Sequence, residues 1–232
     1  MYLAKKWRKI FGKTIMFLLL AIILSSCIFA QSEQGIDLLD TENVEVISIS
    51  TGGDVSTAIT GDGDLWSWGR NYFGQIGDGT TRDRYSPVRI LGGAVAVSVG
   101  GVHAAAIKYD GSLWTWGDNL VGSLGDGSTT NRHSPVRVLD NVIAVSAGTA
   151  HTMAIVADNT LWGWGVGFHG QLGVYAIDYQ LTPLHIMDDV VAVSSGWMHT
   201  MAIKSDGTLW GWGNNWHGQL GDGTTIDIIL YT

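Results

Sequence analysis

The stretch from Leu209 to Gly221, Leu-Trp-Gly-Trp-Gly-Asn-Asn-Trp-His-Gly-Gln-Leu-Gly, follows a pattern that occurs three more times upstream. Copies of its Trp-x-Trp-Gly core follow one another every 48 residues and begin at Trp66, Trp114, Trp162 and Trp210. A Gly-x-x-Gly motif keeps the same spacing and begins at Gly74, Gly122, Gly170 and Gly218. A fixed period of roughly 20 to 50 residues is typical of propellers, solenoids and arrays. The fold is therefore to be predicted from the single repeat.

Alternation and turn residues predict four short strands in each repeat. In the fourth copy, Val190–Ser194 is β-branched and apolar, His199–Lys204 is a second candidate strand and Leu209–Trp212 a third, with Asp206-Gly207 as the hairpin turn before it. We expect the fourth strand to begin at a proline, because proline is tolerated as the first residue of a strand. All three prolines of the chain stand at this point of the repeat, at Pro87, Pro135 and Pro183. Four antiparallel strands in each period predict an all-β fold, a β-propeller of four-stranded blades.

The repeats are placed at residues 46–93, 94–141, 142–189 and 190–232, and the fourth is incomplete. Tyr231 stands where Pro87 predicts a proline, so the last copy lacks its Pro-led strand. An open row of blades leaves unpaired strand edges, which favour aggregation. We therefore expect a partial ring that belongs to a longer protein. A closed ring of four blades and an assembly of two chains are the alternatives.

The first 30 residues have the pattern of an export signal. Five Lys and Arg lie within the first 13 residues, and an uncharged, mostly apolar run from Thr14 to Ser26 follows them. Two cleavage sites remain open: Leu24-Ser25-Ser26-Cys27 resembles a bacterial lipobox, and Ile28-Phe29-Ala30 suits an ordinary signal peptidase. Lipidation of Cys27, the only cysteine, predicts a membrane anchor, whereas cleavage after Ala30 predicts secretion. Residues 31–45 are polar and are expected to form a linker.

The charge of the chain argues against nucleic-acid binding. With the five leader cations set aside, eight Lys and Arg remain against 21 Asp and Glu, so the mature chain carries a net charge of −13 with neutral histidines. Proteins that bind phosphate backbones cluster Lys and Arg on one surface, and no such cluster occurs here. An acidic surface supplies solubility and steers basic partners toward the protein.

The repeat resembles that of the regulator of chromosome condensation (RCC1) family. The resemblance rests on Val145–Ile155, Leu161–Gly165, Gly218–Gly223 and the Pro-Val-Arg-Val strand, and it covers about residues 45–225. It implies an RCC1-type propeller, usually with seven blades. The founding eukaryotic member is a nuclear guanine-nucleotide exchange factor that docks on chromatin, but its exchange residues cannot be mapped onto this sequence. Exported bacterial relatives, which present loops to other proteins and include an inhibitor of β-lactamases, are better analogues.

Three histidines in the same register are the main candidates for chemistry. His103, His151 and His199 lie 48 residues apart, and Val55 takes their place in the first copy. Three imidazoles suit a zinc ion, but the resemblance implies that this histidine packs and forms hydrogen bonds in each blade. No nucleophile elbow, metalloprotease helix or phosphate-binding loop occurs. The sequence thus supports no catalytic, cofactor or metal site, and we expect no enzyme.

Loop residues that differ between the copies are the candidate partner-binding residues. After the Trp-x-Trp-Gly strand, one large side chain recurs at the same position of every copy, and in the first copy a second aromatic residue follows it. Two more large residues lie in the Gly-x-x-His loop of the fourth copy. These candidates are Tyr72, Phe73, Leu120, Phe168, Trp197, Met198 and Trp216. Loop aromatics beside polar groups are typical binding anchors. The alternative is that they pack against the adjacent blade.

The sequence therefore predicts a non-catalytic, exported scaffold that binds a protein or cell-wall partner through loops on one face. A carbohydrate-binding or hydrolytic propeller is the alternative, because sugars also stack on tryptophan. That alternative requires exposed aromatics, such as Trp197 and Trp216, beside a pair of carboxylates in one cleft. Guanine-nucleotide exchange, the third hypothesis, requires a cytosolic form of the protein.

Overall fold

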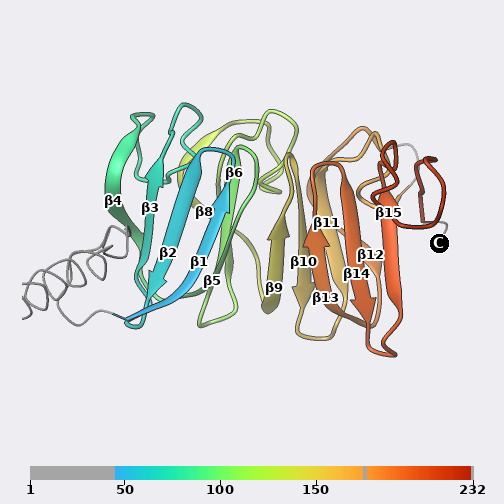
Figure 1. The fold of residues 1–232 in the computed structure, drawn as a ribbon. Helices are drawn as coiled ribbons and strands as arrows, with labels where there is room; N and C mark the ends of the chain where they lie inside the picture. The colour runs from blue at the N-terminus through green and yellow to red at the C-terminus, as the bar shows by residue number, and fades with distance from the viewer. Residues whose placement is uncertain (1–44, 175–176, 231–232) are drawn as a thin grey trace, which may run out of the picture. The chain divides into compact units, whose positions relative to one another are not determined.

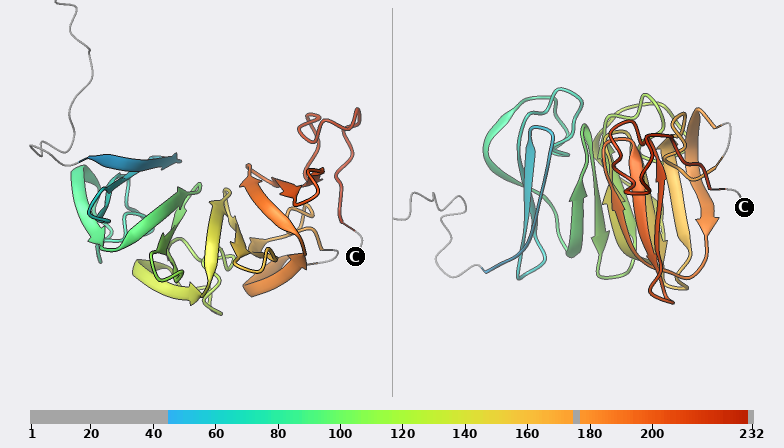
Figure 2. Two further views of the ribbon diagram at one scale, coloured as in Figure 1. Left: turned by 90° about the horizontal axis from the view of Figure 1, so that it is seen from below. Right: turned by 45° about the vertical axis from the view of Figure 1, so that its right-hand side comes forward.

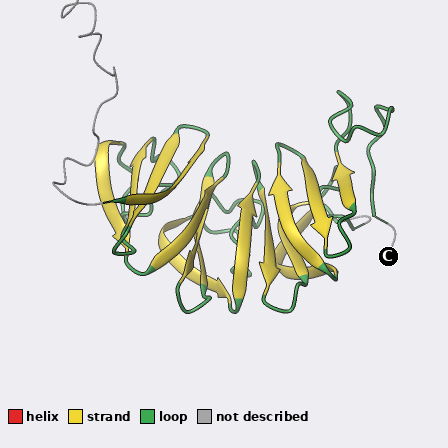
Figure 3. Cartoon of the chain, turned by 60° about the horizontal axis from the view of Figure 1, so that its bottom comes forward, coloured by secondary structure: helices red, strands yellow, loops and turns green. Residues whose placement is uncertain are grey.

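The computed structural model describes residues 45–174 and 177–230. The predicted export signal with Cys27 and all but the last residue of the predicted linker lie outside the described residues. The described part consists of strands and loops without a helix, as the sequence predicts (Figure 3). It therefore holds no apolar helix long enough to cross a bilayer.

Within residues 45–174 and 177–230, fifteen strands form four antiparallel sheets in chain order, called blades 1 to 4. The first sheet holds β1 (Val46–Gly52), β2 (Val55–Thr60), β3 (Leu65–Gly69) and β4 (Arg84–Leu91). The second holds β5 (Ala94–Val99), β6 (His103–Lys108), β7 (Leu113–Gly117) and β8 (Arg132–Leu139). The third holds β9 (Val142–Ala147), β10 (His151–Val156), β11 (Leu161–Val166) and β12 (Tyr179–Met187). The fourth holds β13 (Val190–Ser195), β14 (His199–Lys204) and β15 (Leu209–Gly213).

Each sheet is a meander whose neighbours in space are its neighbours in sequence, so the predicted four-stranded blades are confirmed. Blades 1 to 4 lie side by side in chain order (Figures 1 and 2). Blade 4 has three strands, and a single antiparallel bridge between Gly213 and Ile228 lies where a fourth strand pairs in the other blades. The loops between first and second strands and those between third and fourth strands share one end of the blades, the upper end in Figure 1. We call this the loop face.

The prolines do not begin the fourth strands, and that prediction is wrong. The outer strand β4 begins three residues before Pro87, at Arg84, and β8 and β12 likewise begin before Pro135 and Pro183. The pairing of β3 with β4 shifts register between Ser67 and Gly69, the interval that contains Pro87. Because β4 is an edge strand with an irregular register there, a residue without an N–H is accommodated.

The hydrophobic core lies between neighbouring blades. One buried cluster joins Val55, Leu65 and Ile76 of blade 1 to Ala104 and Trp116 of blade 2. The blade boundaries that follow have equivalent clusters. Contacts between blades are made mainly by the first two strands of each blade. Neighbouring blades thus depend on each other for burial of their apolar residues.

The second tryptophan of each motif crosses the boundary to the preceding blade. Trp164 of blade 3 is fully buried, and its indole Nε1–H donates to the Ser123 carbonyl of blade 2 at 3.0 Å. Its ring lies against Gly125, where a Cβ would approach the indole nitrogen to 2.7 Å. Only glycine fits here, because the φ of Gly125 is also +75°. Trp116 and Trp212 donate in the same way to the carbonyls of Gln75 and Gln171.

Serine hydroxyls link the first strands of neighbouring blades. Ser50 accepts a hydrogen bond from the backbone N–H of Val99 at 3.0 Å, across the boundary between blades 1 and 2. Ser98 and Ser146 accept equivalent bonds from the next blades. A buried N–H that faces another sheet needs such a partner. The serine at this position therefore stabilises the contact between two blades.

Gly125 and Gly221 provide a matched pair that isolates the tryptophan packing. They have nearly the same φ, +75° and +73°, but no heavy atom lies within 4 Å of a Cβ at Gly221. Both alanine substitutions strain the backbone, and only Gly125→Ala also displaces the indole of Trp164. We expect Gly125→Ala to lower the free energy of unfolding by about 1 to 3 kcal/mol more than Gly221→Ala, measured by urea denaturation. Equal losses would show that the close approach of the indole to glycine contributes nothing.

Candidate functional site

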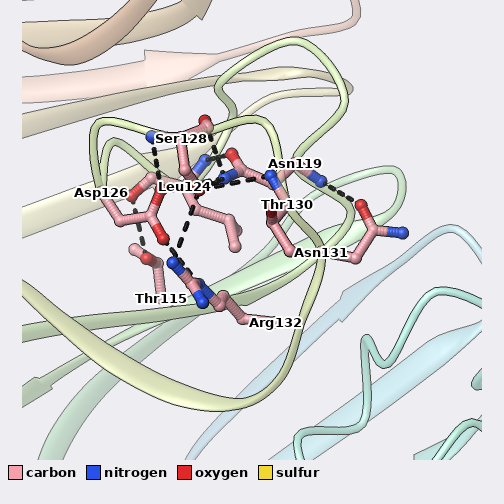
Figure 4. A network of polar contacts seen from close by, with 8 residues as sticks. All are labelled: Thr115, Asn119, Leu124, Asp126, Ser128, Thr130, Asn131 and Arg132. Carbon is pink, nitrogen blue, oxygen red and sulfur yellow. Dashed lines mark hydrogen bonds and ion pairs between the residues drawn. The ribbon is translucent and has the colours of Figure 1, made fainter.

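The long loop after the third strand is built around a buried asparagine. In blade 2, the Nδ2 of Asn119 donates to Asp126 Oδ1 and to the Ser128 carbonyl, both at 3.0 Å, and its Oδ1 accepts from the Leu124 N–H at 3.0 Å (Figure 4). The Asn119 backbone N–H donates to Asn131 Oδ1 at 2.8 Å. One fully buried residue thus ties together four points of the loop, three through its side chain and one through its backbone N–H.

An arginine completes the network. Arg132 Nε lies 2.6 Å from Asp126 Oδ2 (Figure 4). Burial acts to raise the pKa of Asp126, but hydrogen bonds from Ser128 and Arg132 outweigh it and lower the pKa below the ordinary value. The carboxylate is therefore charged and fully paired within its own loop.

Blades 1 and 4 repeat the network around Asn71 and Asn215, but blade 3 does not. Gly167 and Val174 stand at the asparagine and aspartate positions of blade 3. Its loop is held instead by a backbone bond from the Gly167 N–H to the Asp178 carbonyl at 2.9 Å. Blade 3 therefore has a loop of different construction, next to the residues described below.

Five of the seven predicted anchors lie exposed on the loop face. More than half of each side chain is exposed at Tyr72, Leu120, Phe168, Trp197 and Trp216, and Phe73 and Met198 are half-buried. Rings pack edge to face within this surface: the Tyr72 and Phe73 rings are nearly perpendicular, with 4.9 Å between centroids. These large exposed side chains are not buried between the blades.

Four of these anchors meet in one groove of about 300 Å³. Leu120 and Val121 come from blade 2, Phe168 from blade 3, and Trp197 and Met198 from blade 4. Its other described lining residues are Asp118, Thr149, Ala150, Val166 and Gln171. The remaining anchors, Tyr72, Phe73 and Trp216, do not line it. The groove thus combines loops that are up to about 80 residues apart in sequence. The packing of neighbouring repeats brings these loops together.

Trp216 extends the aromatic surface beside the groove. Its ring lies 5.1 Å from that of His169, and His169 lies 4.9 Å from Phe168, which lines the groove. Of the described groove residues, Asp118 is the only carboxylate. The pair of carboxylates that the carbohydrate hypothesis requires is therefore not found among them.

Asp118 is the carboxylate of the groove, and sequence analysis did not single it out. Only 8% of the residue is exposed, and its Oδ1 is buried without a hydrogen-bond partner. Burial raises the pKa of this carboxyl, with the Leu120 N–H and the Asn131 side chain acting in the opposite direction. Those two groups favour the charged form from nearby, but neither makes a hydrogen bond of good geometry to Oδ1. The sequence shows only that position 118 lies in a variable loop.

Two of the three histidines, His103 and His151, join neighbouring blades. His103 Nε2 lies 2.8 Å from Thr152 Oγ1 of the next blade, and Thr152 Oγ1 donates to the Ser123 carbonyl at 2.9 Å. The hydroxyl proton is used in that second bond, so His103 must donate from Nε2. Burial lowers the pKa of His103 to about 4, so the ring is neutral at pH 7. His151 and Thr200 repeat the arrangement at 3.2 Å. The described residues contain no group of three metal-ligating side chains.

The first blade shows why its histidine can be absent. Val55 takes the histidine position, and Ala104 of blade 2 takes the position of Thr152. Both are buried in one apolar cluster. Replacing both partners of a buried hydrogen bond by apolar groups avoids an unpaired polar atom. The two substitutions are thus physically linked.

Tandem blades joined by tryptophan and histidine contacts define the protein as a repeat-type β-propeller protein. The model of the RCC1-like domain matches residues 29–231, and the chain belongs to this family.

Solved structures with the same fold include a human protein and a yeast protein. The chain is similar to human WBSCR16, with 23% identity, coverage of 82% of this chain and 53% of that chain, and a TM-score of 0.74. It is similar to yeast RCC1 (Prp20) bound to Kap60, with 19% identity, coverage of 84% and 50%, and a TM-score of 0.76. The chain thus spans about half the length of these two proteins.

One curated relative matches a single repeat. The E3 ubiquitin-protein ligase HERC2 of Homo sapiens is 38% identical over 47 residues, which are 20% of this chain and 1% of that protein. The match extends over about one 48-residue period, so it concerns the repeat and not the remainder of that ligase.

The buried histidines predict a loss of stability in acid. Burial lowers the pKa of His103 from 6.5 to about 4; for His151, burial and the neighbouring His103 and His199 lower it to about 3. Because the unfolded chain binds these protons more readily, the stabilisation is complete above pH 6.5 and declines as the pH falls toward the lowered values.

Copying the natural Val–Ala pair removes one of these groups. In the double variant His103→Val with Thr152→Ala, the free energy of unfolding should change less steeply between about pH 6 and pH 4, by about 1.4 kcal/mol per pH unit. Urea denaturation across this range measures the slope. The control Thr152→Ala keeps His103 and should keep the steep slope while losing stability. An unchanged slope in the double variant would contradict the neutral, buried state of His103.

Proposed function

We propose that the chain is a non-catalytic, exported scaffold that binds a protein partner through the groove on its loop face. The observation that carries the proposal is the groove itself, in which Leu120, Phe168, Trp197 and Met198 of three blades line one apolar hollow. Apolar and aromatic anchors around a central hollow are typical of binding hot spots. The family supports the coarser statement, since its propellers generally bind other proteins.

Three features support a binding role over catalysis. Among its described lining residues the groove has a single carboxylate, and no nucleophile and base face each other there. The three histidines are occupied in contacts between blades or lie at blade 4 outside the groove lining. Exchange-factor activity has only the family resemblance behind it, and carbohydrate binding has only the exposed Trp197 and Phe168.

The groove can be tested with a phage-displayed library of random peptides selected on the purified full chain. We expect enriched peptides to lose about tenfold or more in affinity on Leu120→Ala or Trp197→Ala, because each removes an apolar wall of the groove. Tyr85→Ala is the matched control, since Tyr85 is 95% exposed on β4 and does not line the groove. Fluorescence anisotropy with labelled peptides measures the affinities.

Two outcomes would overturn the proposed function. One is peptides whose binding is indifferent to Leu120→Ala and Trp197→Ala. The other is retention of glycans on a glycan array that depends on Trp197, with no peptide enriched, which would favour the carbohydrate hypothesis.

Export and anchoring form the second part of the proposal, and the leader pattern supports it. If Cys27 is lipidated, Cys27→Ser should move the protein from the membrane fraction to the medium, and the mass of the native protein should include a diacylglycerol group. If cleavage follows Ala30 instead, the variant should leave the distribution unchanged and the mature chain should begin at Gln31. Fractionation and intact-mass measurement distinguish the two. A protein that keeps residues 1–30 and stays inside the cell would contradict both.

A further inference from the structure

Asp118 differs from the other buried aspartates of the loop face in having no arginine partner among the described residues. The side chains of Asp78 and Asp126 are 8% exposed, and each is paired with an arginine of its own loop, Arg84 or Arg132. Asp118 is 8% exposed as a residue, yet its buried Oδ1 accepts no hydrogen bond from the described residues. A buried carboxylate without a partner is costly to the folded protein.

The fold does not require an aspartate at this position. The equivalent residues of the other blades are Arg70, Val166 and Asn214. In all four blades the backbone N–H at this position donates to a carbonyl in the loop between the first and second strands. In blade 2, the Asp118 N–H donates to the Val102 carbonyl at 3.0 Å. The backbone is therefore satisfied by an acidic, basic, apolar or amide side chain alike. The side chain of Asp118 in blade 2 is thus available to bind a partner.

The described part of the chain has no cation directed at Asp118. Eight Lys and Arg lie in it, and five of them form ion pairs with other aspartates. Lys108 and Lys204 lie over the rings of Trp114 and Trp210 at 5.7 Å. The eighth, Arg82, does not line the groove. Among the described residues none supplies a cation to Asp118, so this carboxyl is open to a cation from a bound partner.

We infer that the groove recognises a peptide segment in which a large apolar side chain lies next to a lysine or arginine, whose cation pairs with Asp118. This inference rests on the proposed function and specifies its partner class. The apolar side chain enters between Leu120, Phe168 and Trp197, and the cation reaches the carboxylate at the wall of the same groove. Apolar walls exclude water and so strengthen the ion pair. The excess of acidic residues in the described chain also attracts basic segments.

The test uses the peptides selected from the same random library. We expect them to carry Lys or Arg within two residues of an aromatic or large aliphatic residue. Replacing that Lys or Arg by Gln should weaken binding to the native protein about tenfold or more. Asp118→Asn should cause a similar loss for the basic peptide and almost none for its Gln version, because the pair is then already broken. Asp140→Asn is the control, since that carboxylate is exposed and paired with Arg137.

Each outcome separates this inference from the proposed function. Peptides that need Leu120 and Trp197 but bind equally well with Gln in place of Lys or Arg would overturn the inference and leave the proposed function standing. Peptides that need neither anchor would overturn the proposed function. Because the exchange of Lys or Arg for Gln is made in the peptide, the measurement on the native protein decides the question even if Asp118→Asn fails to fold.

Discussion

The hydrogen bond from a tryptophan indole to a loop carbonyl of the preceding blade is the contact on which the rest of the structure depends. It spans 41 residues at each of three boundaries, from Trp116, Trp164 and Trp212. Each indole lies on a glycine whose missing side chain permits the approach. Because the apolar cores lie between blades, this contact sets both the spacing of the sheets and the burial of their residues.

The same contact positions the loops of the proposed binding surface. The acceptor carbonyls of Ser123 and Gln171 belong to the long loops of the loop face, three residues beyond Leu120 and Phe168 respectively. Thr152 donates to the Ser123 carbonyl as well, and the Asn119 network holds the remainder of the loop in blade 2. The exposed anchors therefore lie on loops that are held in place by hydrogen bonds from the next blade and within the loop. Binding then requires little ordering of the protein, which favours affinity.

The repeat period explains why the fold could be predicted and the groove could not. Alternation, Asp-Gly turns and the 48-residue spacing determine strands within one blade, and these local signals were sufficient. The error at Pro87 arose because a proline at an edge with shifted register looks like one that begins a strand. The grouping of Leu120, Phe168 and Trp197 depends on how three blades lie side by side, which no local pattern records. Burial of Asp118 follows from the same arrangement.

Function in such a repeat is carried by the differences between its copies. The interblade tryptophan, glycine and serine recur in register because every boundary needs them, so they cannot distinguish one partner from another. Positions 70, 118, 166 and 214 share a backbone hydrogen bond and hold four different side chains. Blade 3 replaces the Asn and Asp of the loop network by Gly167 and Val174, next to Phe168. The groove forms where these departures meet, since uniform blades would give four identical loops and no site of distinct chemistry.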